Sequence, residues 1–235
     1  DFLAYKKDGT GHFLLMIAPQ SELQMEEIAA KQLVFVLDTS GSMMGDKLEQ
    51  AKKALQFCIE NLNAEDTFNI IAFATDVTPF REAPVAATDD NREAALAFID
   101  ELKPRGGTAI ADALAYARKA EADADKVNIT VFLTDGLPTV GTVDPGKILT
   151  QVKEQTARRM FTFGVGYDVN TRLLDGIASK TGGFSSYVTP EENLELALSS
   201  FYNKIAHPVM TDLELDSEGA KLSELIPKEL PDLFK

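Results

Sequence analysis

Between residues 31 and 207, short apolar runs alternate with stretches of helical periodicity. Continuous runs rich in β-branched and aromatic side chains are typical of strands that are buried on both faces of a sheet. Such runs occupy residues 33–37, 68–73, 127–134 and 160–165. We expect shorter strands at residues 77–81 and 184–188.

The stretches between these runs carry apolar residues at spacings of three and four, which is the pattern of a helix with one buried face. Helices are predicted around residues 48–62, 95–102, 110–118, 142–159, 170–180 and 191–205. Asp144 is suited to cap the helix at 142–159, and Pro145 is suited to its first turn. Alternation of strands and helices predicts an α/β fold that is doubly wound, with a mainly parallel central sheet flanked by helices.

The ends of the chain have a different pattern. Residues 11–20 are typical of a strand stopped by Pro19, and residues 209–216 alternate apolar and polar side chains, as a half-buried strand does. The pattern is compatible with a pairing of these two strands beside the core. The tail at 226–235 contains two prolines and is expected to be irregular.

These differences predict a three-part organisation. Residues 1–30 form a flanking segment that ends a preceding β domain, and residues 31–207 form the central domain. Residues 208–235 form a second flanking segment that begins a following β region.

Composition narrows the classes of function. The formal net charge of −14 disfavours nucleic-acid binding, because contacts to phosphates require clustered Lys and Arg. No apolar run approaches the ~18 residues of a membrane span, so we expect no direct insertion of this chain into a membrane. Cys58 is the single cysteine, which excludes a disulfide within the chain, and its apolar surroundings predict a buried thiol.

The candidate chemistry lies where the predicted strands end. The strand at 33–37 runs into Asp38-Thr39-Ser40-Gly41-Ser42, and the strand at 127–134 runs into Asp135-Gly136. Between them in sequence, Gly106-Gly107-Thr108 precedes a predicted helix, and the glycines would let the backbone come close enough to present Thr108 inward. Ligands of open α/β sheets bind beyond the carboxyl ends of strands. We therefore expect these groups to converge.

All these groups are oxygen donors, with no histidine or cysteine among them. Oxygen-only sites suit hard cations such as Mg²⁺, Mn²⁺ or Ca²⁺. Neutral hydroxyl ligands would leave such an ion electrophilic and able to take a further carboxylate from outside. Each short motif alone is also compatible with a turn or a helix cap; their order along one α/β pattern makes the set specific.

The set resembles the metal-ion-dependent adhesion site of von Willebrand factor type A domains, which have a Rossmann-like fold. The resemblance covers about residues 31–207 and implies a metal site made by Asp38, Ser40, Ser42, Thr108 and Asp135. It implies direct ligation by Ser40 and Ser42, ligation by Thr108 in the ligand-bound arrangement, and action of the two aspartates largely through water and hydrogen bonds. It also implies an adhesion or protein-interaction module, not an enzyme, whose cation (Mg²⁺, or Mn²⁺ or Ca²⁺) binds a Glu or Asp carboxylate of a protein partner.

The segments on either side of residues 31–207 narrow the resemblance to one group of proteins with A domains. Residues 13–19, 208–215 and 227–234 are similar to segments that adjoin the A domain in inter-alpha-trypsin inhibitor heavy chains and their bacterial relatives. An alanine-rich, acidic chain without a disulfide favours the bacterial side. The resemblance implies an extracytoplasmic location, that is, a secreted, periplasmic or cell-surface protein.

Other functions stay open at this stage. A strand-end aspartate beside Mg²⁺ is also the phosphoryl acceptor of some phosphotransferases and hydrolases, which would assign that role to Asp38. The second aspartate of haloacid dehalogenases is replaced by Ser40, which removes the expected general acid. A serine hydrolase would need a histidine base, but His12 and His207 are both far from Ser40 in sequence. A purely structural domain stabilised by a metal is the third alternative.

Overall fold

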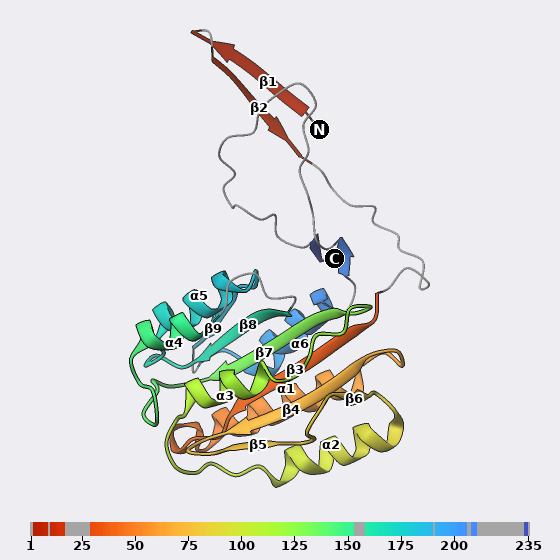
Figure 1. The fold of residues 1–235 in the computed structure, drawn as a ribbon, viewed down its shortest axis with the longest axis vertical. Helices are drawn as coiled ribbons and strands as arrows, with labels where there is room; N and C mark the ends of the chain where they lie inside the picture. Colours follow the sequence, from red (N-terminus) through yellow and green to blue (C-terminus); the bar gives the residue numbers. More distant parts are fainter. Residues whose placement is uncertain are drawn as a thin grey trace.

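The structure of the protein is a computed structural model, which describes residues 2–8, 10–16, 29–152, 158–189, 191–205, 208–210 and 233–234. Figure 1 shows a twisted sheet with helices on both of its faces. The strands are β1 (Phe2–Lys7), β2 (Thr10–Leu15), β3 (Lys31–Asp38), β4 (Thr67–Phe73), β5 (Val77–Pro79), β6 (Val85–Ala86), β7 (Val127–Thr134), β8 (Arg158–Val165), β9 (Ser185–Val188), β10 (Pro208–Met210) and β11 (Leu233–Phe234). The helices are α1 (Asp46–Glu60), α2 (Asp89–Glu101), α3 (Ile110–Ala117), α4 (Pro145–Gln151), α5 (Thr171–Lys180) and α6 (Leu194–Ile205), with a 3₁₀ turn at Gly41–Met43.

The large sheet has the strand order β5-β4-β3-β7-β8-β9, and β6 pairs with β4 at its edge. The neighbours from β4 to β9 pair in parallel, whereas β5 and β6 are antiparallel to β4. Every residue of β3 and β7 is buried, as their continuous apolar runs predict. The predicted α/β fold with a mainly parallel, doubly wound sheet is confirmed.

Two hydrophobic cores lie on opposite faces of the sheet. Side chains that alternate along β3 divide between them: Leu33 and Phe35 join the core under α1, α2 and α6, whereas Val34 and Val36 join the core under α3, α4 and α5. The predicted buried thiol of Cys58 lies in the first core.

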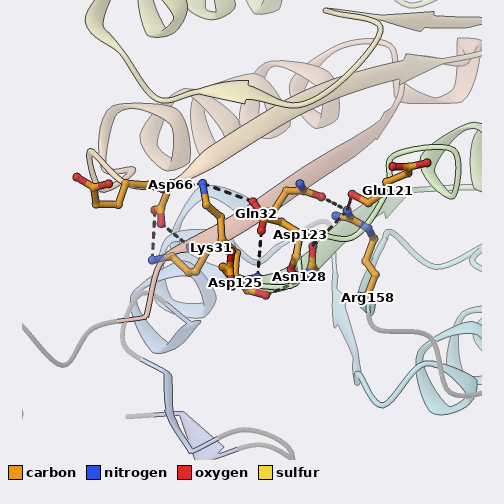
Figure 2. Close-up of polar contacts among 10 residues, drawn as sticks. Lys31, Gln32, Asp66, Glu121, Asp123, Asp125, Asn128 and Arg158 are labelled. Atoms are coloured by element: carbon orange, nitrogen blue, oxygen red, sulfur yellow. Dashed lines mark hydrogen bonds and ion pairs between the residues drawn. The ribbon is translucent and has the colours of Figure 1, made fainter.

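A buried polar network holds the amino ends of the strands together, at the edge opposite the predicted site (Figure 2). Lys31 Nζ lies 3.2 Å from Asp66 Oδ2, and both side chains have no exposed surface. The Lys31 N–H also donates to Asp66 Oδ1 at 2.8 Å. Arg158, at the start of β8, donates to Gln32 Oε1 and to the Glu121 carbonyl.

The predicted helix at 142–159 is wrong at its carboxyl end. Asp144 caps α4 and Pro145 begins it, as expected, but α4 ends at Gln151. Arg158 and Arg159 belong to β8, where they pair with Asn128 and Ile129 of β7. Residues 153–157 lie outside the described residues.

Where the structure describes the two flanking strands, each pairs with another partner and not with the other flank, although their pattern had allowed that pairing. β2 pairs with β1 in an antiparallel hairpin, and β10 pairs with β11. β11 also contradicts the expectation of an irregular tail at residues 233 and 234. The rest of that tail, residues 17–20 of the first predicted strand and residues 211–216 of the second lie outside the described residues. The three-part domain division stays a prediction.

Candidate functional site

The two predicted aspartates meet because β3 and β7 are adjacent parallel strands. Leu37 of β3 pairs with Leu133 of β7, so Asp38 and Thr134 end their strands side by side, and Asp135 follows directly. The Thr134 hydroxyl donates to Asp38 Oδ2 at 2.5 Å, which bridges the two strand ends. The carboxyl edge of the sheet therefore gathers carboxylates that are far apart in sequence.

The two serines lie in the same cluster. The Ser40 N–H donates to Asp38 Oδ1 at 2.8 Å, which holds the loop after β3 in a tight turn. Ser40 Oγ and Ser42 Oγ are 3.0 Å apart, and Ser42 Oγ donates to Asp135 Oδ1 at 2.7 Å. Hydrogen bonds thus connect Ser40 through Ser42 to Asp135.

Thr108 reaches the same place from a third loop. A Cβ built on Gly136 would lie 3.7 Å from Ser42 Oγ and 3.9 Å from Thr108 Oγ1, so both hydroxyls flank Gly136. Gly106 allows this approach: its φ is +63°, and a Cβ there would come within 2.4 Å of Thr75 Oγ1.

Backbone hydrogen bonds fix this third loop against its neighbours. Gly41 N–H donates to the Gly106 carbonyl at 3.1 Å, and Arg105 N–H donates to the Thr39 carbonyl at 2.8 Å. The structure therefore places all five residues that the sequence singled out at the same edge of the sheet.

Burial disfavours the charged form of the Asp38 carboxyl in this cluster. Asp38 has no exposed surface, and burial raises the pKa of its carboxyl from 3.8 to about 6. Hydrogen bonds from Thr134 and Ser40 act in the opposite direction, and the nearby Asp135 carboxylate raises the pKa further. A bound cation would relieve both the burial and the repulsion between carboxylates.

The chemistry and spacing of the donors fit a small hard cation. Neighbouring oxygens around an octahedral ion with metal–oxygen bonds of ~2.1 Å lie about 3 Å apart. The distances of 3.0 Å between Ser40 Oγ and Ser42 Oγ and of 2.7 Å between Ser42 Oγ and Asp135 Oδ1 are close to that spacing. Within the described ranges, no group of three or more His, Cys, Asp or Glu side chains could hold a metal ion, so a cation here would depend on hydroxyl ligands.

Sequence reasoning missed two side chains of the site. Thr134 directly precedes the Asp135-Gly136 motif, and its hydroxyl faces back to Asp38 across the strand pair. Lys47, in the first turn of α1, places its ammonium 2.6 Å from Asp135 Oδ2. The amphipathic pattern of α1 identifies its buried face, but it does not indicate that this lysine points toward a strand end 88 residues away.

Comparison with known proteins agrees with this architecture. The family model described as the von Willebrand factor type A domain matches residues 31–187. Inter-alpha-trypsin inhibitor heavy chain H4 of Homo sapiens is 32% identical over an alignment of 235 residues that covers 96% of this chain and 25% of that protein. Heavy chain H4 of Sus scrofa is 34% identical with the same coverage. The chain thus spans about a quarter of the length of these curated relatives.

Solved structures share the fold at lower identity. A von Willebrand factor type A protein from Catenulispora acidiphila aligns with a TM-score of 0.68 and 22% identity, over 76% of this chain and 43% of that one. Proximal thread matrix protein 1 from the mussel byssus, described with a zinc-occupied MIDAS motif, aligns with a TM-score of 0.59 and 20% identity, over 76% and 45%. Because the family model covers more than half of the chain, this protein belongs to the von Willebrand factor type A domain family, whose members commonly act in adhesion or protein interaction, and its curated relatives are inter-alpha-trypsin inhibitor heavy chains.

Proposed function

We propose that this domain binds one divalent cation at the carboxyl edge of its sheet and uses the cation to capture an acidic side chain of a protein partner. The proposed ligand set is Asp38, Ser40, Ser42, Thr108 and Asp135. The observation that carries the proposal is the hydrogen-bonded cluster of Ser40, Ser42 and Asp135 beside the buried carboxylate of Asp38. The oxygen-only donors favour Mg²⁺, with Mn²⁺ and Ca²⁺ as further candidates.

The surroundings of the cluster suit a protein partner. Met44, Leu137 and Tyr167 are large exposed apolar side chains, and each lies on a loop that follows one of the strands β3, β7 and β8. Exposed apolar side chains grouped at one end of a domain are typical of interaction surfaces. A partner carboxylate bound to the cation would bring neighbouring residues of the partner onto these side chains.

The environment of Asp38 favours an interaction module over a phosphotransferase. Its two carboxylate oxygens accept hydrogen bonds from the Ser40 N–H and the Thr134 hydroxyl, and the side chain has no exposed surface. A nucleophilic carboxylate needs an oxygen that can reach a substrate.

A serine hydrolase would need a histidine base near Ser40. His12 lies on the β1–β2 hairpin and is not part of the site, and His207 lies outside the described residues.

Isothermal titration with Mg²⁺ and Mn²⁺ tests the metal site. We expect one binding event in the native protein and none in Asp38→Ala or Asp135→Ala. Asp112→Ala is the matched control, because Asp112 is an exposed carboxylate on α3 outside the hydrogen-bonded cluster. Unchanged binding in Asp38→Ala would refute the assignment.

An array of surface-bound peptides tests carboxylate capture. Each peptide carries a central Asp or Glu, and its matched partner carries Asn or Gln. We expect binding that requires both the carboxylate and Mg²⁺ and that disappears in excess EDTA. Binding that survives chelation, or that does not distinguish Glu from Gln, would exclude carboxylate capture. Metal-dependent stability without binding to any peptide would favour the purely structural alternative.

We also infer an extracytoplasmic location for the full protein. The inference is supported by the kinship with inter-alpha-trypsin inhibitor heavy chains and by the structural likeness to a matrix protein of mussel byssus. Among the described residues, no helix is both long and apolar enough to cross a bilayer. Fractionation of the native host with an antibody to this domain tests the location, and recovery only from the cytoplasmic fraction would contradict it.

A further inference from the structure

Lys47 binds the carboxylate oxygen of Asp135 that the Ser42 hydroxyl does not contact. Asp135 Oδ1 accepts the Ser42 hydroxyl at 2.7 Å, whereas Oδ2 accepts the Lys47 ammonium at 2.6 Å. The two oxygens of one carboxylate therefore have different partners: Oδ1 belongs to the hydroxyl cluster that we propose to hold the metal, and Oδ2 binds a side chain of the protein itself. Lys47 can stay in place when an ion binds on the other side.

The position of Lys47 is fixed from several directions. It extends from the first turn of α1, and its ammonium also lies beside the loop after β8, where a Cβ built on Gly166 would be 3.4 Å from Nζ. The Asp135 side chain has no exposed surface, whereas Lys47 is 35% exposed. A fully buried carboxylate thus has a partly solvated counter-ion.

The formal charges in the site show what this lysine changes. The Asp38 and Asp135 carboxylates and the Lys47 ammonium together carry one net negative charge when all are ionised. A divalent cation turns this into one net positive charge. Without Lys47, the same cation would leave the site neutral.

We propose that Lys47 sets the charge of the site: it weakens the binding of the divalent cation and strengthens the attraction of the loaded site for a carboxylate. This inference rests on the proposed function and adds a residue that determines its affinity and specificity. The two effects have opposite signs, because the ammonium repels the cation and attracts the incoming anion. Replacement of a lysine with a merely structural role would not change the affinities for the cation and for the carboxylate in opposite directions.

The test uses Mn²⁺ as the probe ion, with free Mn²⁺ measured by electron paramagnetic resonance. The repulsion between the Lys47 ammonium and a divalent ion about 6 Å away is screened in part by water and salt. Removal of the ammonium should therefore tighten Mn²⁺ binding roughly three- to tenfold. We expect that gain in Lys47→Met, whereas Lys47→Arg should bind Mn²⁺ like the native protein. Lys53→Met, a change at an exposed lysine of the same helix, is the matched control.

The second arm measures the carboxylate. Glutarate is titrated into the Mn²⁺-loaded proteins, and its binding is followed by the loss of water-proton relaxation enhancement as it displaces a bound water. Lys47→Met should bind glutarate several-fold more weakly than the native protein, whereas Lys47→Arg and Lys53→Met should match it.

Thermal melts ensure that a damaged variant is recognised. In EDTA, Lys47→Met should melt below the native protein, because Asp135 then lacks its counter-ion, and saturating Mn²⁺ should raise its melting temperature by more than that of the native protein. A folded Lys47→Met whose Mn²⁺ affinity equals that of the native protein overturns the role of Lys47 and leaves the metal site standing. A native protein that binds no Mn²⁺ overturns the proposed function itself.

Discussion

Replacement of Asp38 by asparagine should stabilise the metal-free protein at neutral pH while it abolishes cation binding. Asparagine has nearly the same shape, its Oδ1 can accept the Ser40 N–H, and its amide can donate to the Thr134 hydroxyl. What it removes is a negative charge that has no exposed surface. The substitution therefore separates the electrostatic cost of the site from its packing.

The magnitude follows from the pKa of Asp38, which burial raises from 3.8 to about 6. Because this pKa is higher in the folded state, the folded protein holds a proton that the unfolded chain releases. The free energy of unfolding of the metal-free protein then falls as pH rises from about 4 to about 6, and it stays low above that window. Two pKa units correspond to about 3 kcal/mol, and burial of the new amide offsets part of the gain. We expect a net gain of ~1–3 kcal/mol at pH 7.5, which is a rise of several degrees in melting temperature.

Urea and thermal unfolding in EDTA at pH 4.5 and 7.5 measure the effect, and repetition with Mg²⁺ measures the loss of metal stabilisation. The advantage of Asp38→Asn should be small at pH 4.5 and largest at pH 7.5. Mg²⁺ should raise the melting temperature of the native protein only. A variant less stable than the native protein at pH 7.5, or a difference that does not change with pH, would refute the electrostatic reasoning.

Three further changes test other parts of the structure. Gly183→Ala would place a Cβ 2.0 Å from the Met160 carbonyl oxygen, so we expect a loss of more than about 2 kcal/mol in urea unfolding; a loss below 0.5 kcal/mol would show that this contact relaxes freely. Lys31→Met leaves the fully buried Asp66 carboxylate without its ion pair and should cost ~3–5 kcal/mol, much of which Lys31→Met/Asp66→Leu should restore; equal stability of the single and double variants would contradict this coupling. Ser42→Ala removes the hydroxyl that donates to the buried Asp135 carboxylate, so calorimetry should find weaker Mg²⁺ binding and urea unfolding in EDTA should show a loss of about 1–3 kcal/mol; unaltered affinity would remove Ser42 from the ligand set.

Helix and strand types were predictable where the local pattern and the tertiary environment agree. The runs at 33–37 and 127–134 became β3 and β7 because strands covered on both faces are apolar throughout. The pattern failed at Arg158, because pairing with β7 draws that residue into β8. A guanidinium at a strand start has no apolar signal, and its pairing with Gln32, distant in sequence, is decided only after folding.

By itself, the sequence determined the α/β class, the strand-end motifs and the five side chains of the candidate site, since each depends on residue type and local spacing. Only the tertiary structure decided that β3 and β7 are neighbours, that Thr134 bridges to Asp38, and that Lys47 meets Asp135. These contacts join residues about 90 positions apart, and the order of strands in the sheet brings them together. A residue pattern predicts which face of an element is buried, but the charge balance of a site depends on which elements become neighbours.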